Sequence, residues 1–135
     1  MGDRKNAIMM LALAKEDLAL LEVLRDDDRI SNRLFGFHAQ QAVEKMLKAV
    51  LSLHGVRYRW THDLVTLIDL LKENGIAFPQ ELEEARRLNP FATDLRCDDL
   101  PDERQERLDR AWAMDCVRRT RRWAEAIIGE QKPTG

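Results

Sequence analysis

The segment from about residue 32 to residue 54 constrains the fold most strongly. Its apolar residues recur every three or four positions, which is the spacing of one face of an α-helix. The face covers more than half of the helix circumference, so we expect this helix at the centre of a bundle. We also expect a second copy of the chain to cover what a small bundle leaves exposed. The face consists of Phe35, Ala39, Ala42, Met46, Ala49 and Leu53, widened by Val43, Leu47 and Val50.

Helical spacing recurs along the rest of the chain. It predicts further helices over about 4–26, 61–74, 79–88 and 102–129. Helices of matching length joined by mostly short connections favour an antiparallel arrangement. The sequence therefore predicts an all-α fold, an up-and-down antiparallel helical bundle of four main helices plus a short extra helix. We expect one domain over residues 1–135, since domains of about 100–200 residues are typical.

Small polar residues, glycine and proline mark where these helices begin and end. A short polar side chain before a helix accepts a hydrogen bond from its first turn, and glycine readily adopts the left-handed conformation that ends one. Ser31 or Asn32 and then Thr61 are the expected caps, and Gly55, Asn74-Gly75 and Asn89-Pro90 are the expected ends.

Composition excludes several classes of protein. The 22 lysines and arginines are balanced by 24 acidic residues, giving a net charge of −2, so any nucleic-acid binding needs a local basic patch. Few aromatic residues, glycines and prolines argue against an all-β fold. Cys97 and Cys116 match no zinc spacing, and we expect no metal or cofactor. No apolar stretch approaches the ~20 residues of a membrane span, so a cytoplasmic protein without a membrane partner is expected.

The second predicted helix also carries a polar side. His38, Gln41, Lys45 and Lys48 are spaced by three or four positions, so they share one face of that helix. Such a face is typical of a solvated surface or a dimer contact. It equally suits a groove that binds a nucleotide or an RNA backbone.

Basic residues also cluster in two other segments, a loop and the last predicted helix. The loop Arg57–His62 alternates basic and aromatic side chains, which can contact phosphates and stack on bases. The alternative is that Trp60 closes one end of the bundle while the arginines remain in water. The last helix carries Arg118, Arg119, Arg121 and Arg122, which helical geometry spreads around its surface.

Three motifs follow one another along the chain. They are Phe37-His38-Ala39-Gln40-Gln41-Ala42-x-Glu44-Lys45-x-Leu47-Lys48-Ala49, then Thr61-His62-Asp63-Leu64, then Ala92-Thr93-Asp94-x-Arg96. In this order they resemble the HEPN domain family, named for higher eukaryotes and prokaryotes nucleotide-binding. The resemblance extends from about residue 8 to residue 129. It implies a helical bundle that usually dimerises and that is often encoded beside a minimal nucleotidyltransferase, in some cases as a toxin–antitoxin module.

Ribonucleases of the HEPN family carry an arginine followed by four to six residues and a histidine, near the start of the last long helix. In that catalytic arrangement the histidine acts as acid or base and the arginine stabilises phosphate charge. Here no histidine follows Arg96, which argues against nuclease activity. Two other pairs, Arg33 with His38 and Arg57 with His62, have the spacing but not the position.

The leading hypothesis is a homodimeric protein that binds a minimal nucleotidyltransferase, a nucleotide, or both, without being an enzyme. One alternative is an RNA-cleaving toxin with an atypical Arg/His site. Another is a helical oligomerisation scaffold. No catalytic residue is assigned, and the expected binding residues are His38, Gln41, Lys45, Arg96, Arg57 and His62.

Overall fold

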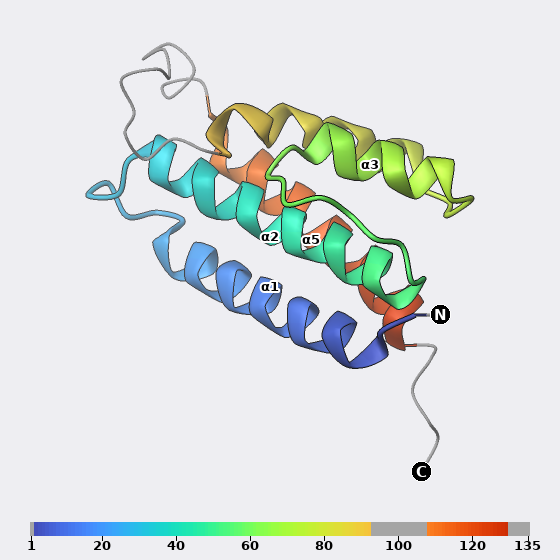
Figure 1. Ribbon diagram of the computed structural model, residues 1–135. Helices are drawn as coiled ribbons and strands as arrows, with labels where there is room; N and C mark the ends of the chain where they lie inside the picture. Colours follow the sequence, from blue (N-terminus) through green and yellow to red (C-terminus); the bar gives the residue numbers. More distant parts are fainter. Residues whose placement is uncertain (1, 93–107, 130–135) are drawn as a thin grey trace.

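The computed structural model describes residues 2–92 and 108–129, and these form helices without strands. The all-α helical bundle predicted from the sequence is confirmed (Figure 1). Within the described ranges, no helix is both long enough and apolar enough to cross a bilayer. The helices are α1 (Arg4–Leu24), α2 (Asn32–Leu53), α3 (Leu64–Glu73), the 3-10 helix η1 (Gln80–Phe91) and α5 (Arg110–Gly129).

Three of the expected helix ends are confirmed. The Ser31 side chain accepts a hydrogen bond from the backbone N–H of Leu34 at 3.1 Å, so it caps α2. Gly55 and Gly75 follow α2 and α3 with φ of 71° and 73°, in the left-handed region that glycine adopts readily. These caps and ends fix the lengths of the two helices that border the loop Arg57–His62.

Three expected ends are wrong. Asp63, not Thr61, caps α3, because its carboxylate lies 2.9 Å from the N–H of Val65. The helix η1 continues past Pro90 to Phe91, with a hydrogen bond from Ala92 N–H to the Asn89 carbonyl at 3.0 Å. The last helix begins at Arg110 and not at residue 102. Its Asp109 accepts from the N–H of Trp112, and residues 102–107 lie outside the described part of the chain.

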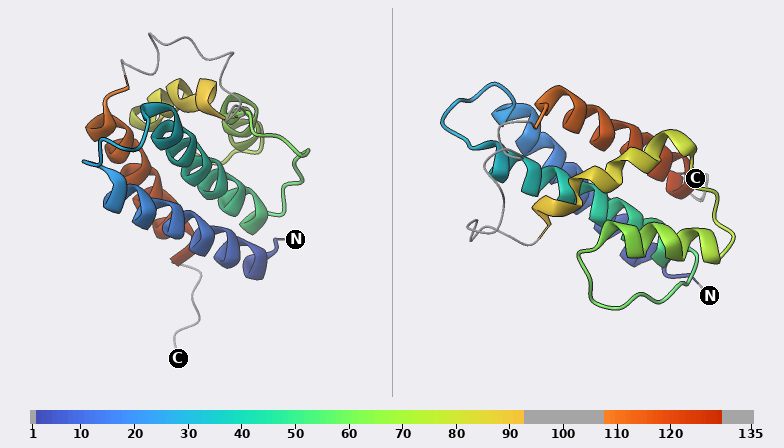
Figure 2. Two further views of the ribbon diagram at one scale, coloured as in Figure 1. Left: turned by 90° about the vertical axis from the view of Figure 1, so that its left-hand side faces the viewer. Right: turned by 90° about the horizontal axis from the view of Figure 1, so that it is seen from above.

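Helix α2 is the centre of the molecule, as its apolar face predicts. It contacts each of the other four helices and lies among them in the left view of Figure 2. Every apolar residue of α2 from Phe35 to Leu51 is buried except Phe37, which is partly exposed. The expectation that a second copy must cover the wide apolar face of α2 is therefore wrong. The pair formed by α3 and η1 covers the side that α1 and α5 leave open.

The connection between α2 and α3 positions the loop residues. Residues 54–63 run back along α2 before α3 begins, so α3 points in the same direction as α2 (Figure 1). The pairs α1–α2 and α3–η1 are each antiparallel. The returning path brings the basic and aromatic residues of this loop beside the polar side of α2.

A close approach joins α2 to η1. A Cβ atom at Gly36 would lie 2.6 Å from the ring of Phe91, which is closer than side chains pack. The absence of a side chain at Gly36 thus lets the end of η1 settle onto α2. This contact holds η1 against the half of α2 that carries His38 and Gln41.

Candidate functional site

A buried group of charged side chains lies between α2 and the returning loop. The Glu44 side chain is only 4% exposed. Its Oε2 accepts from Lys48 Nζ at 2.8 Å, one helical turn further along α2. The Nδ1 atom of His62 lies 3.0 Å from Glu44 Oε1. Because a carboxylate only accepts, Glu44 selects the form of His62 that carries a proton on Nδ1, and the histidine thereby ties the loop to α2.

Two glutamine amides extend this buried group. The Gln40 amide donates to Glu44 Oε1 at 3.1 Å and to the His62 carbonyl at 2.7 Å. The Gln41 amide donates to Gln40 Oε1 at 2.9 Å. Buried polar groups cost little when they are hydrogen-bonded in this way. The loop is thus held at both the side chain and the backbone of His62.

Two aromatic rings lie over Lys48. Its Nζ atom is 5.2 Å from the centre of the Trp60 ring and 5.6 Å from that of Tyr58, within the range of a cation–π contact. The Trp60 ring also meets His62 edge to face, with 5.2 Å between centroids. Yet Trp60 is 85% exposed, so most of its ring is open to solvent while its contacts with Lys48 and His62 hold it in place. The prediction that Trp60 closes the end of the bundle is not what the structure shows.

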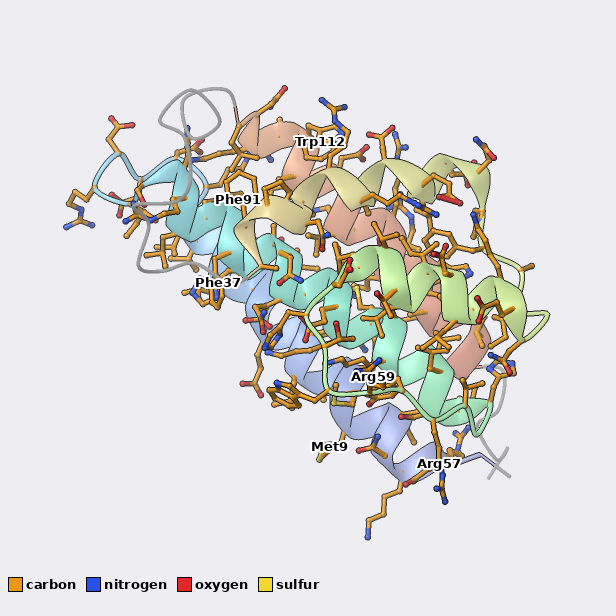
Figure 3. All side chains as sticks on the ribbon, turned by 45° about the horizontal axis from the view of Figure 1, so that its top comes forward. Met9, Phe37, Arg57, Arg59, Phe91 and Trp112 are labelled. Carbon is orange, nitrogen blue, oxygen red and sulfur yellow. The ribbon has the colours of Figure 1, made fainter. Side chains whose placement is uncertain are left out.

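Arg57 and Arg59 lie on the exposed side of the same loop (Figure 3). Neither has an ion-pair partner among the residues that the structure describes. Two unpaired guanidinium groups beside an exposed indole make a local basic patch despite the net charge of −2. Such a patch can attract phosphate through charge and a base through stacking.

A second group of charged side chains lies between α1 and α2. Lys45 Nζ binds Asp17 Oδ2 at 2.6 Å, and His38 Nδ1 lies 3.5 Å from Asp17 Oδ1. His38 Nδ1 is buried without a hydrogen bond. Asp17 therefore neutralises part of the polar side of α2, which the sequence suggested could bind a nucleotide or an RNA backbone.

Comparison with protein families decides where the chain belongs. The model of the HEPN domain matches residues 9–128, which is most of the chain. The chain belongs to the HEPN domain family. Neither the curated proteins nor the solved structures gave a match to it.

The residues expected from the sequence thus fall into separate places in this HEPN domain. His62 and Gln41 belong to the group around Glu44, and Arg57 lies on the exposed side of the same loop. His38 and Lys45 belong to the group around Asp17. Arg96, like Cys97, lies outside the described residues.

The central residue of the buried group, Glu44, was missed by the sequence reasoning. The signal was present, because Glu44 and Lys48 form an acid–base pair four positions apart on a helix that is otherwise apolar over most of its surface. A charged pair within a predicted buried face requires local partners. Tyr58 and Gln40 also join the loop to α2, but the sequence carries no comparable signal for their contacts.

The Arg–His pairs of nuclease spacing do not form a common site in this HEPN domain. Arg33 and His38 are five positions apart on α2, so they point about 140° from each other around the helix. In the second pair, Arg57 is exposed while Nδ1 of His62 is bound to Glu44. Only the second pair keeps a histidine next to an open basic surface.

A small cavity adjoins His62 and the residues beside it in the loop. It has a volume of about 330 Å³ and is lined by Thr61, His62, Asp63, Asn89 and Ala92. Burial acts to raise the pKa of Asp63, but hydrogen bonds from Asn89 and Thr66 outweigh it and lower the pKa. Asp63 is therefore ionised at neutral pH, and the cavity that it lines does not favour an anion.

Three other kinds of site, a metal centre, a reactive thiol and a basic surface on α5, were considered in the described part of the HEPN domain. No group of three or more histidine, cysteine or acidic side chains there could hold a metal ion. Burial and the nearby Glu84 carboxylate raise the pKa of Cys116 to about 12, so its thiol is not a nucleophile at neutral pH. Among the four clustered arginines of α5, Arg118, Arg119 and Arg121 pair with carboxylates.

Proposed function

We propose that this HEPN protein binds a nucleotide on the surface of the loop Arg57–His62 and acts as the accessory partner of a minimal nucleotidyltransferase, without being the catalyst. The observation that carries the proposal is the exposed Trp60 ring, held in place over Lys48 and beside His62. The resemblance to HEPN proteins encoded beside such transferases supports the partner, in a module of the toxin–antitoxin type.

The loop has the chemistry that a nucleotide needs. Stacking of a base on an aromatic side chain is worth about 1–3 kcal/mol. Arg57 and Arg59 supply donors that suit phosphate oxygens. The hydrogen bonds of His62 to Glu44 and Gln40 hold the loop before any ligand arrives, so binding costs less conformational entropy.

Titration with ATP and GTP, followed by calorimetry and by tryptophan emission, tests nucleotide binding. Trp60→Ala should weaken binding about tenfold, which corresponds to 1.4 kcal/mol. Arg57→Ala should weaken binding as well, whereas Arg122→Ala, the same change at an exposed arginine of α5, should not. Lys45→Ala should keep full affinity, because Lys45 is paired with Asp17. Full affinity in Trp60→Ala, or no binding by the native protein, contradicts the proposal.

The partner is tested by affinity purification of the tagged protein from its native cells, with identification by mass spectrometry. A small nucleotidyltransferase recovered in near-stoichiometric amount supports the partner role. Recovery of the HEPN protein alone counts against it, and leaves the nucleotide titration as the separate test of the loop.

RNA cleavage is the second candidate, favoured by the contact between Glu44 and His62. A carboxylate that binds Nδ1 of a histidine leaves Nε2 able to accept a proton, as in a general base. In that case His62→Gln abolishes cleavage of RNA by the purified protein and Arg122→Ala does not. Cleavage that persists in His62→Gln excludes this mechanism.

A further inference from the structure

A second open cavity lies between α5 and the start of η1, and it shares no residue with the nucleotide site. Its volume of about 590 Å³ is within the range of about 300–1,000 Å³ that is usual for small-molecule pockets. We call it the α5–η1 cavity. Both helices contribute lining residues, which are Arg119, Arg122 and Trp123 from α5 and Pro79, Glu81 and Leu82 from the start of η1. Because the three residues of α5 are three and four positions apart, they share one side of that helix.

The apolar part of the α5–η1 cavity is already held in place. The Trp123 indole N–H donates to the Ala77 carbonyl at 3.3 Å. The Trp123 ring also meets the Phe78 ring edge to face, with 5.2 Å between centroids. Leu82 is only 4% exposed, so it is fixed in the core below the cavity. An apolar side chain of a ligand can therefore pack here at a low cost in conformational entropy.

Two opposite charges that line the α5–η1 cavity have no partner. The Arg122 guanidinium group and the Glu81 carboxylate are both exposed. Neither forms an ion pair with a residue that the structure describes. They come from different walls, because Arg122 is on α5 and Glu81 is on η1. A ligand between the walls can meet one of them with a negative group and the other with a positive group.

Asp115 sets the balance of charge at the α5–η1 cavity. Its Oδ2 lies 2.7 Å from Nη2 of Arg119, one helical turn further along α5. A guanidinium group has five N–H donors, so this ion pair orients Arg119 and leaves donors for a ligand. Asp115 and Glu81 together balance the charges of the two arginines. The cavity therefore does not favour the several negative charges of a nucleotide, and it suits a ligand without net charge.

We propose that the α5–η1 cavity binds a zwitterion with a large apolar side chain, which is the chemistry of a free amino acid or of a short peptide with both ends free. Its carboxylate binds Arg122 and the remaining donors of Arg119. Its ammonium group binds Glu81, and its side chain packs on Trp123 and Leu82. Binding at this site requires nothing of the loop that we propose for the nucleotide.

The three tryptophans of the chain allow the site to be located by NMR. Each gives one indole N–H signal in the ¹H–¹⁵N spectrum of the full chain, and Trp60→Phe and Trp112→Phe assign the signals. Titration with phenylalanine, and separately with the dipeptide leucylphenylalanine, should shift the signal of Trp123 and not that of Trp60. We expect a dissociation constant of about 1 mM or below for the tighter ligand, which distinguishes a free amino acid from a peptide. If neither ligand shifts the Trp123 signal up to about 10 mM, the proposal is wrong.

Two derivatives of phenylalanine separate the charged contacts. Phenylalanine amide lacks the carboxylate and N-acetylphenylalanine lacks the ammonium group, so each should bind about fivefold or more weakly than phenylalanine. Arg122→Ala should weaken the binding of phenylalanine by about fivefold and leave that of the amide unchanged. Glu81→Gln should weaken the binding of phenylalanine and not that of N-acetylphenylalanine, which has no positive group to lose its partner.

Arg118→Ala is the matched control for Arg122→Ala. Arg118 is also an arginine of α5, but it pairs with Glu22 of α1 and does not line the α5–η1 cavity. Its replacement should leave the affinity for phenylalanine unchanged, and circular dichroism confirms that each variant folds. Equal affinity for phenylalanine and its two derivatives, or equal losses in Arg118→Ala and Arg122→Ala, overturns the proposal. Neither result depends on whether the loop binds a nucleotide.

Discussion

Two groups of charged side chains on α2 differ in how much water reaches them. The group of Glu44, Lys48 and His62 lies beneath the returning loop, with the Glu44 and Lys48 side chains only 4% and 6% exposed. The group of Asp17 and Lys45, joined by His38, lies between α1 and α2, with the Asp17 and Lys45 side chains 13% and 26% exposed. Both contain one acid between two basic side chains, so the comparison separates the effect of burial from that of composition.

The difference teaches that the same kinds of charged side chain on one helix can have different roles. A buried ion pair is costly to break, because the remaining charge has no water to solvate it. A partly exposed pair contributes less, since water can replace part of what the lost partner supplied. We therefore expect the group around Glu44 to hold the loop in place. The group around Asp17 should tolerate the loss of a charge with little change in the free energy of unfolding.

The largest effect is expected for Glu44→Ala. The change leaves the Lys48 ammonium buried without its acceptor and frees His62 from α2. Loss of one partner of a buried pair typically costs about 3–5 kcal/mol in the free energy of unfolding. Urea denaturation followed by circular dichroism measures it. The matched control is Asp17→Ala, which should cost about 1 kcal/mol or less. Equal losses in the two variants would show that burial does not distinguish the groups.

A double-mutant cycle gives the next largest effect. Glu44→Gln and Lys48→Met each leave an unpaired polar group, but together they remove both charges. The double variant should therefore lose less stability than the sum of the single variants, with a coupling of about 2 kcal/mol. The same denaturation experiment measures all three proteins. A coupling near zero would mean that Lys48 is stabilised by Tyr58 and Trp60 and not by Glu44.

The smallest effect is expected for Asp17→Asn. The substitution keeps the shape of the side chain and removes the charge that Lys45 contacts at 2.6 Å. We expect a loss of about 0.5 kcal/mol at low salt, and a slightly smaller one at high salt because ions partly screen a pair that water can reach. Denaturation at two NaCl concentrations measures both. If salt does not change the loss in the free energy of unfolding, the Asp17 group behaves like the buried group around Glu44.

Much of the fold could be predicted because helix periodicity and end signals are local. The apolar face of α2, the cap at Ser31 and the end at Gly55 are each encoded within a few residues. Thr61 was preferred over Asp63 as a cap because the two lie two positions apart and both accept hydrogen bonds, so only the path of the chain decides between them.

The site was harder to predict, because its contacts join segments far apart in the sequence. Spacing placed His38, Gln41 and Lys45 on one side of a helix, but it could not show that Asp17 of α1 would meet two of them. The sequence favours a cap or a buried hydrogen bond for His62, but the return of the loop along α2 has no periodicity, so Glu44 could not be predicted as its partner.

The central place of α2 has a consequence for how the molecule opens. A helix that contacts all the others cannot separate without disturbing each of them. Its backbone amides should therefore exchange hydrogen with deuterium only when the whole bundle unfolds, whereas the amides of the outer helices exchange through smaller openings. The exchange rate of α2 thus reports the stability of the entire protein, and that of α1 reports how readily its edge comes away.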